Sequence, residues 1–272
     1  MPYYERKVAR HSRDERRLRN FGFRLTLLYR TLPQSPTAPA PSRKEPMVTL
    51  VHFESLDLTL DSICTNRLIL YGDNYMNVVE HYDILIDENN DPVYDPDSLK
   101  KYMDKWDGQV FIDAMKLDKT KNILEIGVGT GRLALKTIPL CKEFVGIDLS
   151  PKTIERATHN LSQYKNLKLI CDDFMTHNFG TTFDVVYSSL TFMHIKEKQQ
   201  CINKIYSLLN PKGILVLSID KNKKEYINYG ERKIKIYPDN LDNTKKYFIN
   251  SYLTLLDCIE TEFAYILVGL KS

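Results

Sequence analysis

The chain lacks features that mark several classes of protein. No apolar run approaches the ~20 residues that a membrane-spanning helix requires, so no membrane association is expected. Its five cysteines are odd in number and widely spaced, and none forms a C-x-x-C pair. Neither a disulfide framework nor a metal site is therefore indicated, and we expect a protein of the reducing cytoplasm.

Charge is unevenly distributed along the chain. Residues 1–46 contain eleven basic and four acidic residues, a net charge of +7, whereas the remainder has 27 basic and 31 acidic residues, a net charge of −4. The first 46 residues are also rich in arginine and then proline, which predicts an extension without regular structure. We interpret it as an upstream extension ahead of Met47. An RNA-binding arm and a transit peptide are the alternatives, although Glu5, Asp14 and Glu15 count against the latter.

Residues 47–118 are predicted to form a helical lid region before the main domain, residues 119–272. The alternation in 47–72 supports no assignment, whereas residues 73–85 suit a short amphipathic helix. Residues 97–116 carry a broad apolar stripe that includes Trp106, and predict one helix with Asp97 as its N-cap.

From residue 121 onward, short apolar runs alternate with helical segments. The runs cover 123–126, 144–147, 167–171, 183–187 and 214–219, and the clearest helices 131–140, 151–163 and 195–209. Such alternation predicts a parallel sheet with helices on both faces. Residues 210–213 predict a turn between a helix and a strand, and 256–262 with 263–270 predict a terminal hairpin that adds one antiparallel strand.

One segment joins a buried strand to a glycine-rich turn. Residues 123–132 read ILEIGVGTGR. Glycine permits positive φ and lets a ligand lie against the main chain, and a helix starting near Thr130 would offer N–H groups to a carboxylate. The G-x-G-x-G spacing differs from the G-x-G-x-x-G of dinucleotide sites.

The next two strands end in acidic residues. Asp148 follows Gly131 by 17 residues, where its carboxylate can accept hydrogen bonds from both hydroxyls of a ribose. Asp172 ends the following strand, where it can accept from an adenine amino group while Phe174 packs near the ring.

These three elements, in this order, resemble the class I S-adenosylmethionine (SAM)-dependent methyltransferases, from about residue 73 to the C-terminus. In that family E-x-G-x-G-x-G binds the methionine end of the cofactor, and it matches Glu125, Gly127, Gly129 and Gly131. The family's two later acids match Asp148 and Asp172. Residues 183–190 and 208–215 also agree, with P-K-G at 211–213 where many members have P-G-G.

The resemblance implies a three-layer Rossmann-like α/β sandwich, whose mostly parallel seven-stranded sheet has an antiparallel C-terminal strand. It implies SAM as the cofactor and, because insertions are few and short, a small-molecule acceptor. Besides the matched residues, the expected cofactor site includes Val128, Thr130, Leu149, Asp173, Phe174, Ser188, Leu190, Tyr82 and Trp106. Tyr82 and Trp106 could cover the sulfonium with their π faces, with core packing as the alternative role.

Methyl transfer from a sulfonium needs alignment and a dry pocket more than acid–base groups, which explains why no catalytic triad is evident. His194, just after the fourth strand, is the candidate base, with helix capping as the alternative. Residues 188–191 read SSLT rather than the (N/D)-P-P-(Y/F) of nucleobase amine methyltransferases, so a nucleic acid acceptor is not expected. The tyrosine-containing insertion 221–240 is expected to fold over the pocket mouth.

Two other functions remain open from the sequence. An NAD(P)-dependent oxidoreductase would also use a Rossmann-like sheet, and the glycine spacing is what argues against it. A SAM-binding protein without catalytic activity would share every motif described above. The acceptor, its reacting atom and the oligomeric state are not indicated.

Overall fold

The computed structural model describes residues 75–272. The basic extension 1–46 and the weakly alternating stretch 47–72 lie outside the described residues. Within the described part, no helix has the length and apolar character needed to cross a membrane.

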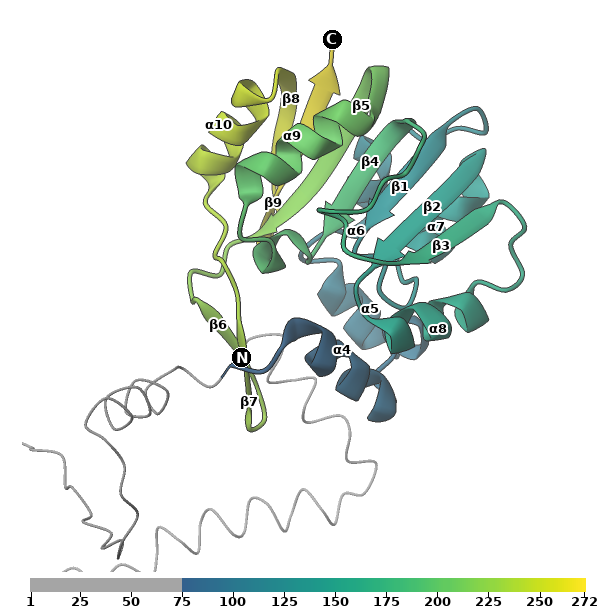
Figure 1. Cartoon of the computed structure of the whole chain (residues 1–272), viewed down its shortest axis with the longest axis vertical. Helices are drawn as coiled ribbons and strands as arrows, with labels where there is room; N and C mark the ends of the chain where they lie inside the picture. Colours follow the sequence, from purple (N-terminus) through teal and green to yellow (C-terminus); the bar gives the residue numbers. More distant parts are fainter. Residues whose placement is uncertain (1–74) are drawn as a thin grey trace, which may run out of the picture. The chain divides into compact units, whose positions relative to one another are not determined.

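A seven-stranded sheet forms the centre of the domain, in the order β3-β2-β1-β4-β5-β9-β8 (Figure 1). Strands β1 to β5 pair in parallel, while β9 pairs antiparallel with both β5 and β8. The expected fold class and terminal hairpin are confirmed, and the antiparallel strand lies one place inside the sheet edge. The strands are β1 (Asn122–Ile126), β2 (Glu143–Asp148), β3 (Leu167–Cys171), β4 (Phe183–Ser189), β5 (Leu209–Asp220), β8 (Leu253–Glu260) and β9 (Ala264–Lys271).

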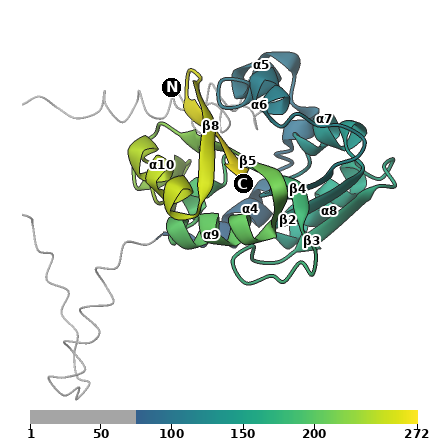
Figure 2. The same ribbon diagram turned by 90° about the horizontal axis from the view of Figure 1, so that it is seen from above.

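Helices cover both faces of this sheet (Figures 1 and 2). Neighbouring residues of β1, such as Ile123 and Leu124, are both fully buried because each points into a different apolar cluster. This is the pattern of a parallel strand covered on both sides. One face carries α6 (Gly108–Ala114), α7 (Ala134–Thr137) and α8 (Pro151–Asn160), and the other carries α9 (Lys198–Leu208) and α10 (Leu241–Asn250).

The single helix predicted over 97–116 is wrong, because the structure breaks it into α5 (Asp97–Met103) and α6. Gly108 has a φ of +65°, which a helix cannot continue through, and the Asp107 side chain accepts from the Gly108 N–H to start α6. The N-cap of α5 is Pro96, and Asp97 is its first helical residue. The apolar stripe survives the break because both short helices pack against the core.

Two further expectations after the glycine turn need correction. The helix predicted over 131–140 is a four-residue α7 followed by the 3-10 turn η2 (Ile138–Leu140), because Pro139 has no N–H to continue an α-helix. No long helix dipole therefore faces the glycine turn. The turn predicted at 210–213 is a register slip within β5, where Lys212 has a φ of +64°.

A group of short elements lies beyond the carboxyl ends of the parallel strands (Figure 1). It consists of α4 (Val78–Asp87), the 3-10 turns η1 (Pro92–Tyr94) and η3 (Phe192–His194), and a hairpin of β6 (Tyr226–Tyr229) and β7 (Arg232–Lys235). Asp83 of α4 accepts from the Ser150 hydroxyl at 2.6 Å, and Glu88 pairs with Arg232 at 2.7 Å. These contacts hold α4 against both the β2–α8 loop and the hairpin.

Candidate functional site

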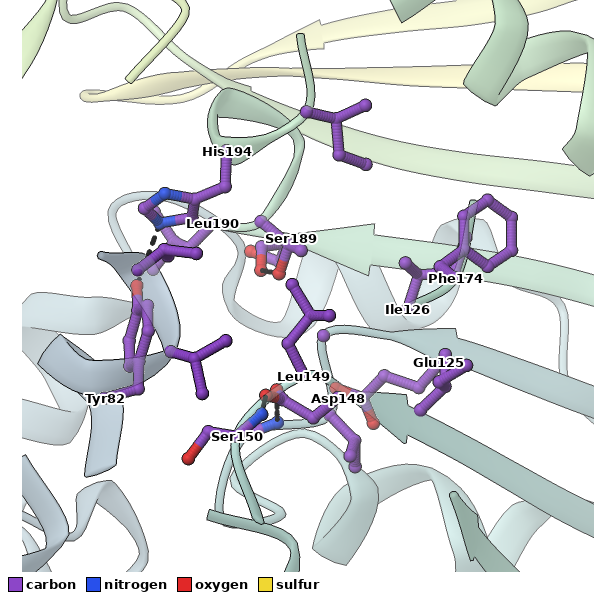
Figure 3. Close-up of a pocket in the computed structure, with 18 of the residues that line it drawn as sticks. Tyr82, Glu125, Ile126, Asp148, Leu149, Ser150, Phe174, Ser189, Leu190 and His194 are labelled. Atoms are coloured by element: carbon purple, nitrogen blue, oxygen red, sulfur yellow. Dashed lines mark hydrogen bonds between the residues drawn. The ribbon is translucent and has the colours of Figure 1, made fainter. Parts of the chain in front are cut away.

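A cavity of about 380 Å³ lies at the carboxyl ends of β1, β2 and β4 (Figure 3). Its walls come from the turn after β1, the loops after β2 to β4, α4, η3 and the β6 strand. The carboxyl edge of a parallel sheet is where α/β folds bind ligands, and the volume suits a small organic molecule.

The glycine turn after β1 forms one wall of this cavity. Gly127 and Gly129 have φ values of +74° and +57°, a region that side chains rarely adopt. A Cβ atom at Gly127 would collide with the Thr191 side chain, so this glycine permits close packing. A Cβ at Gly129 would meet nothing within 4 Å, so the space beside its Cα is open to a ligand. The neighbouring Thr130 also lines the cavity, and its hydroxyl is buried with no hydrogen-bond partner among the described residues.

Asp148 ends β2 directly beside the glycine turn (Figure 3). Its carboxylate accepts from the Gly129 N–H at 3.0 Å and from the Ser150 N–H at 3.1 Å. Burial raises the pKa of this carboxyl group, and the two amide donors oppose that effect. Asp148 is therefore held rigidly in the cavity wall as a hydrogen-bond acceptor.

Glu125, at the end of β1, is almost wholly buried and lines the same cavity. It accepts from the Tyr187 hydroxyl at 2.9 Å, and Tyr187 is itself 2.7 Å from the Thr137 hydroxyl. Burial raises the pKa of Glu125 to about 8, which the Tyr187 hydrogen bond and the charge of Arg132 offset only in part. At neutral pH this side chain is therefore mostly protonated.

Asp107 and Arg132 form a buried pair behind the cavity that the sequence did not indicate. Arg132 Nη1 donates to Asp107 at 3.0 Å, and the Ser189 hydroxyl donates to the same carboxylate at 2.8 Å. Although burial alone would raise it, the pKa of Asp107 lies below its ordinary value because Arg132, Gly108 and Ser189 stabilise the carboxylate. Arg132 and Ser189 both line the cavity.

The acids after β3 lie at another part of the cavity wall. Asp172 is exposed and is 2.7 Å from His177 Nδ1, and this hydrogen bond holds the pKa of Asp172 below its ordinary value. Asp173 accepts from the Met175 N–H at 2.8 Å, so it also shapes the loop. Phe174 is buried and touches the cavity with part of its ring.

Tyr82 and His194 meet on the side formed by α4 and η3 (Figure 3). The Tyr82 hydroxyl lies 2.9 Å from His194 Nε2, and both side chains line the cavity. Burial and, to a smaller extent, the charge of the Lys198 ammonium together lower the pKa of His194 to about 4. Between β4 and η3, Leu190 reaches the cavity with a φ of +57°, a strained conformation for a leucine.

Three residues expected at the cofactor do not line the cavity. Gly131 packs against Leu161, and the Ser188 hydroxyl donates to the Ile126 carbonyl at 2.9 Å. Trp106 is buried against Phe263, with ring centroids 4.6 Å apart. The other expected residues lie at the cavity, as does Tyr229 of the insertion. Lining residues that no motif indicated include Val78, Val79, Leu85, Ser150, Thr191 and Ile195.

The fold and the cavity together define an α/β protein with a preformed cavity at the carboxyl edge of a parallel sheet. Residues 124–217 match the family model described as "Methyltransferase domain". An uncharacterized methyltransferase of Anoxybacillus flavithermus is 30% identical over 151 residues, which cover 54% of this chain and 68% of that protein. The chain belongs to the class I SAM-dependent methyltransferases, a family whose cofactor is SAM.

Two further proteins resemble this chain, one in sequence and one in fold. Malonyl-[acyl-carrier protein] O-methyltransferase 1 of Ilyobacter polytropus is 34% identical over 42% of this chain and 43% of its own length. The crystal structure of the N-methyltransferase NodS from Bradyrhizobium japonicum, in complex with S-adenosyl-L-homocysteine, has a TM-score of 0.54 at 16% identity, over 70% of this chain and 97% of that one. The second likeness concerns the fold alone. The chain spans about half the length of the first curated relatives it matches.

Proposed function

We propose that this protein transfers the methyl group of SAM to a small-molecule acceptor in the cytoplasm. The observation that carries the proposal is the single cavity that joins the open Gly129 backbone and the Asp148 carboxylate to the Tyr82–His194 pair. The part next to the glycine turn offers hydrogen-bond acceptors and an open glycine to a nucleoside. The part next to Tyr82 and His194 offers room for the molecule that receives the methyl group.

The residues at the glycine turn fit SAM. Asp148 would accept from the two ribose hydroxyls, since its position is already set by the Gly129 and Ser150 amides. Glu125 and Thr130 would lie at the polar methionine end, and Asp172 and Phe174 at the adenine. When bound, the sulfonium supplies an activated methyl group with a neutral thioether as its leaving group.

The chain's own contribution is alignment and exclusion of water. Leu85, Leu190, Ile195 and Tyr229 give the α4–η3 side of the cavity apolar walls. Holding an acceptor in line with the methyl group can lower the barrier by about 7–11 kcal/mol. Tyr229, from the hairpin insertion, would thereby help to select the acceptor.

The direct test is an assay for S-adenosylhomocysteine formation with purified protein, SAM and a small-molecule extract of cells. We expect product to form, together with extract components that gain one CH₂ unit by mass spectrometry. Tight binding of SAM without any turnover would instead favour a non-catalytic SAM-binding protein. Stabilisation by NAD but not by SAM would contradict the proposal altogether.

A matched pair of glycine variants tests the cofactor position. Gly129 and Gly180 both have positive φ, and a Cβ at either meets nothing within 4 Å. Each change to alanine should therefore lower the free energy of unfolding by a similar amount, about 1–2 kcal/mol. Only Gly129→Ala should weaken SAM binding, by about tenfold, because its methyl group would occupy space that the ligand needs. If calorimetric titration gave equal SAM affinities for the two variants, the proposal that SAM binds against the glycine turn would be wrong.

A further inference from the structure

The Tyr82–His194 pair joins two elements that are far apart in sequence. Tyr82 comes from α4 and His194 from η3, and the two rings are nearly perpendicular, at 86° with centroids 5.6 Å apart. Because both side chains line the cavity, an acceptor lying between α4 and η3 would meet this pair (Figure 3).

The surroundings of His194 disfavour its protonated form. A histidine that acts as a base usually has a carboxylate or a carbonyl at its second nitrogen, which stabilises the imidazolium. Here Nδ1 is buried and has no hydrogen-bond partner among residues 75–272. The charge that acts on the imidazole is the buried ammonium of Lys198, which donates to the Phe192 carbonyl at 2.8 Å and to Asp239 at 2.6 Å.

The other titratable groups around the pair do not change this conclusion. His81 of α4 lies edge-on to the Tyr82 ring, with centroids 5.2 Å apart, and edge-on to the Tyr229 ring of β6, with centroids 5.5 Å apart. Lys196 and Glu197, between η3 and α9, are exposed and pair with each other at 3.8 Å. None of them provides the carboxylate that an imidazolium would need.

The walls around the pair are apolar. Val78, Val79 and Leu85 of α4 face the cavity from one side, and Leu190 and Ile195 line it next to η3. An acceptor that reacts as a carboxylate would need a cation here, and one that carries an ammonium group would need a carboxylate. Among residues 75–272, the charged lining residues near η3 are Lys196 and Glu197, and both side chains are exposed to solvent.

A hydroxyl acceptor is disfavoured for a different reason. Neutral hydroxyl groups are weak nucleophiles and need a base to remove the proton. The neutral, desolvated His194 beside Lys198 is too weak a base for that task. An uncharged nitrogen carries a reactive lone pair without losing a proton, so it suits both the apolar walls and the weak base.

We propose, in an extension that rests on the proposed function, that the acceptor is an uncharged nitrogen nucleophile on an apolar body. The Tyr82 hydroxyl, oriented by donating its proton to His194 Nε2, accepts a hydrogen bond from the acceptor N–H and so positions the nitrogen. The nitrogen lone pair forms the N–C bond, and the C–S bond breaks with its electron pair staying on sulfur. The product leaves with the positive charge on nitrogen and loses a proton to water. His194 is then a positioning residue.

The reacting atom can be read from the product. The protein is incubated with a small-molecule extract and SAM whose methyl carbon is isotope-labelled, and the carbon chemical shift of the product methyl is measured by NMR. An N-methyl signal is expected. An O-methyl, S-methyl or C-methyl signal would overturn this inference and leave the proposed function intact. Absence of S-adenosylhomocysteine formation would contradict the proposed function itself.

Variants of the pair separate positioning from base catalysis, with the extract fraction that yields product as the acceptor source. Tyr82→Phe removes the hydroxyl and with it the neutral hydrogen bond to the acceptor N–H, so kcat/KM for the acceptor should fall about tenfold, mainly through KM. His194→Gln keeps an oxygen that can accept from Tyr82 and should stay near wild type, whereas His194→Leu should match Tyr82→Phe. The control Tyr206→Phe, on α9 and away from the cavity, should change nothing.

A base would give a different pattern. Loss of a general base lowers kcat by about a hundredfold to ten-thousandfold, and it removes a limb of the pH–rate profile. We expect the profile of kcat to keep its shape in Tyr82→Phe and His194→Gln, with the Kd for SAM unchanged. A loss of that size in both His194 variants, together with a changed profile, would overturn the positioning role.

Discussion

Asp148→Asn is expected to weaken SAM binding about a hundredfold. An anionic carboxylate that accepts from both ribose hydroxyls makes two charge-assisted hydrogen bonds, each stronger than its neutral counterpart. Asparagine keeps one oxygen for the Gly129 N–H, so the turn should survive, but its NH₂ group cannot accept from a hydroxyl. A loss of about 3 kcal/mol corresponds to two factors of ten in Kd, measured by calorimetric titration.

Asp184→Asn is the matched control for this experiment. Asp184, near the start of β4, also accepts from a backbone amide, that of Asn122 at 2.8 Å, and from the Asn210 side chain at 2.8 Å. It does not line the cavity, so its change should lower the melting temperature without altering SAM affinity. Equal Kd values for Asp148→Asn and the wild type would refute the ribose assignment.

The sequence predicted those site residues correctly whose place follows from the order of the strands along the chain. Strands that run in parallel bring their carboxyl ends to one edge, so Glu125, Asp148 and Asp172 could be placed together without knowing any distance. The hairpin insertion was likewise expected near the cavity, and Tyr229 does line it. Its other tyrosines, Tyr226 and Tyr237, do not.

The remaining site residues depend on contacts that no local pattern encodes. Asp107 and Arg132 are 25 residues apart, and the apolar stripe over 97–116 concealed the helix break that turns Asp107 toward Arg132. Tyr82 and His194 are separated by 112 residues. Each was a reasonable candidate alone, but their hydrogen bond depends on how α4 packs against η3. Trp106 shows the converse, since an aromatic residue near the site proved to belong to the core.

SAM affinity should rise with pH between about pH 6 and pH 7.5, by up to tenfold per pH unit if one proton is released on binding. In the free protein burial raises the pKa of Glu125 to about 8, so the group is mostly protonated over this range. The ammonium of the methionine end, placed beside Glu125, favours the carboxylate and lowers that pKa in the complex. A group whose pKa falls on binding releases a proton, so the complex gains stability as pH rises toward the free-protein value. We limit the predicted pH range to values below about 7.5, because the α-amino group of SAM has an ordinary pKa of about 7.7–8.0 and would itself lose a proton above it.

Glu125→Gln identifies the group responsible, because burial also raises the pKa of Asp148. Glutamine imitates the protonated carboxyl group and keeps an oxygen for the Tyr187 hydroxyl, which donates to Glu125 at 2.9 Å. This variant should bind SAM weakly at every pH and show no proton release when titrated in buffers of different ionisation enthalpy. The exposed Glu143→Gln should behave as the wild type. Proton release that persists in Glu125→Gln would assign the coupling to Asp148, and the methionine end would then no longer be linked to Glu125.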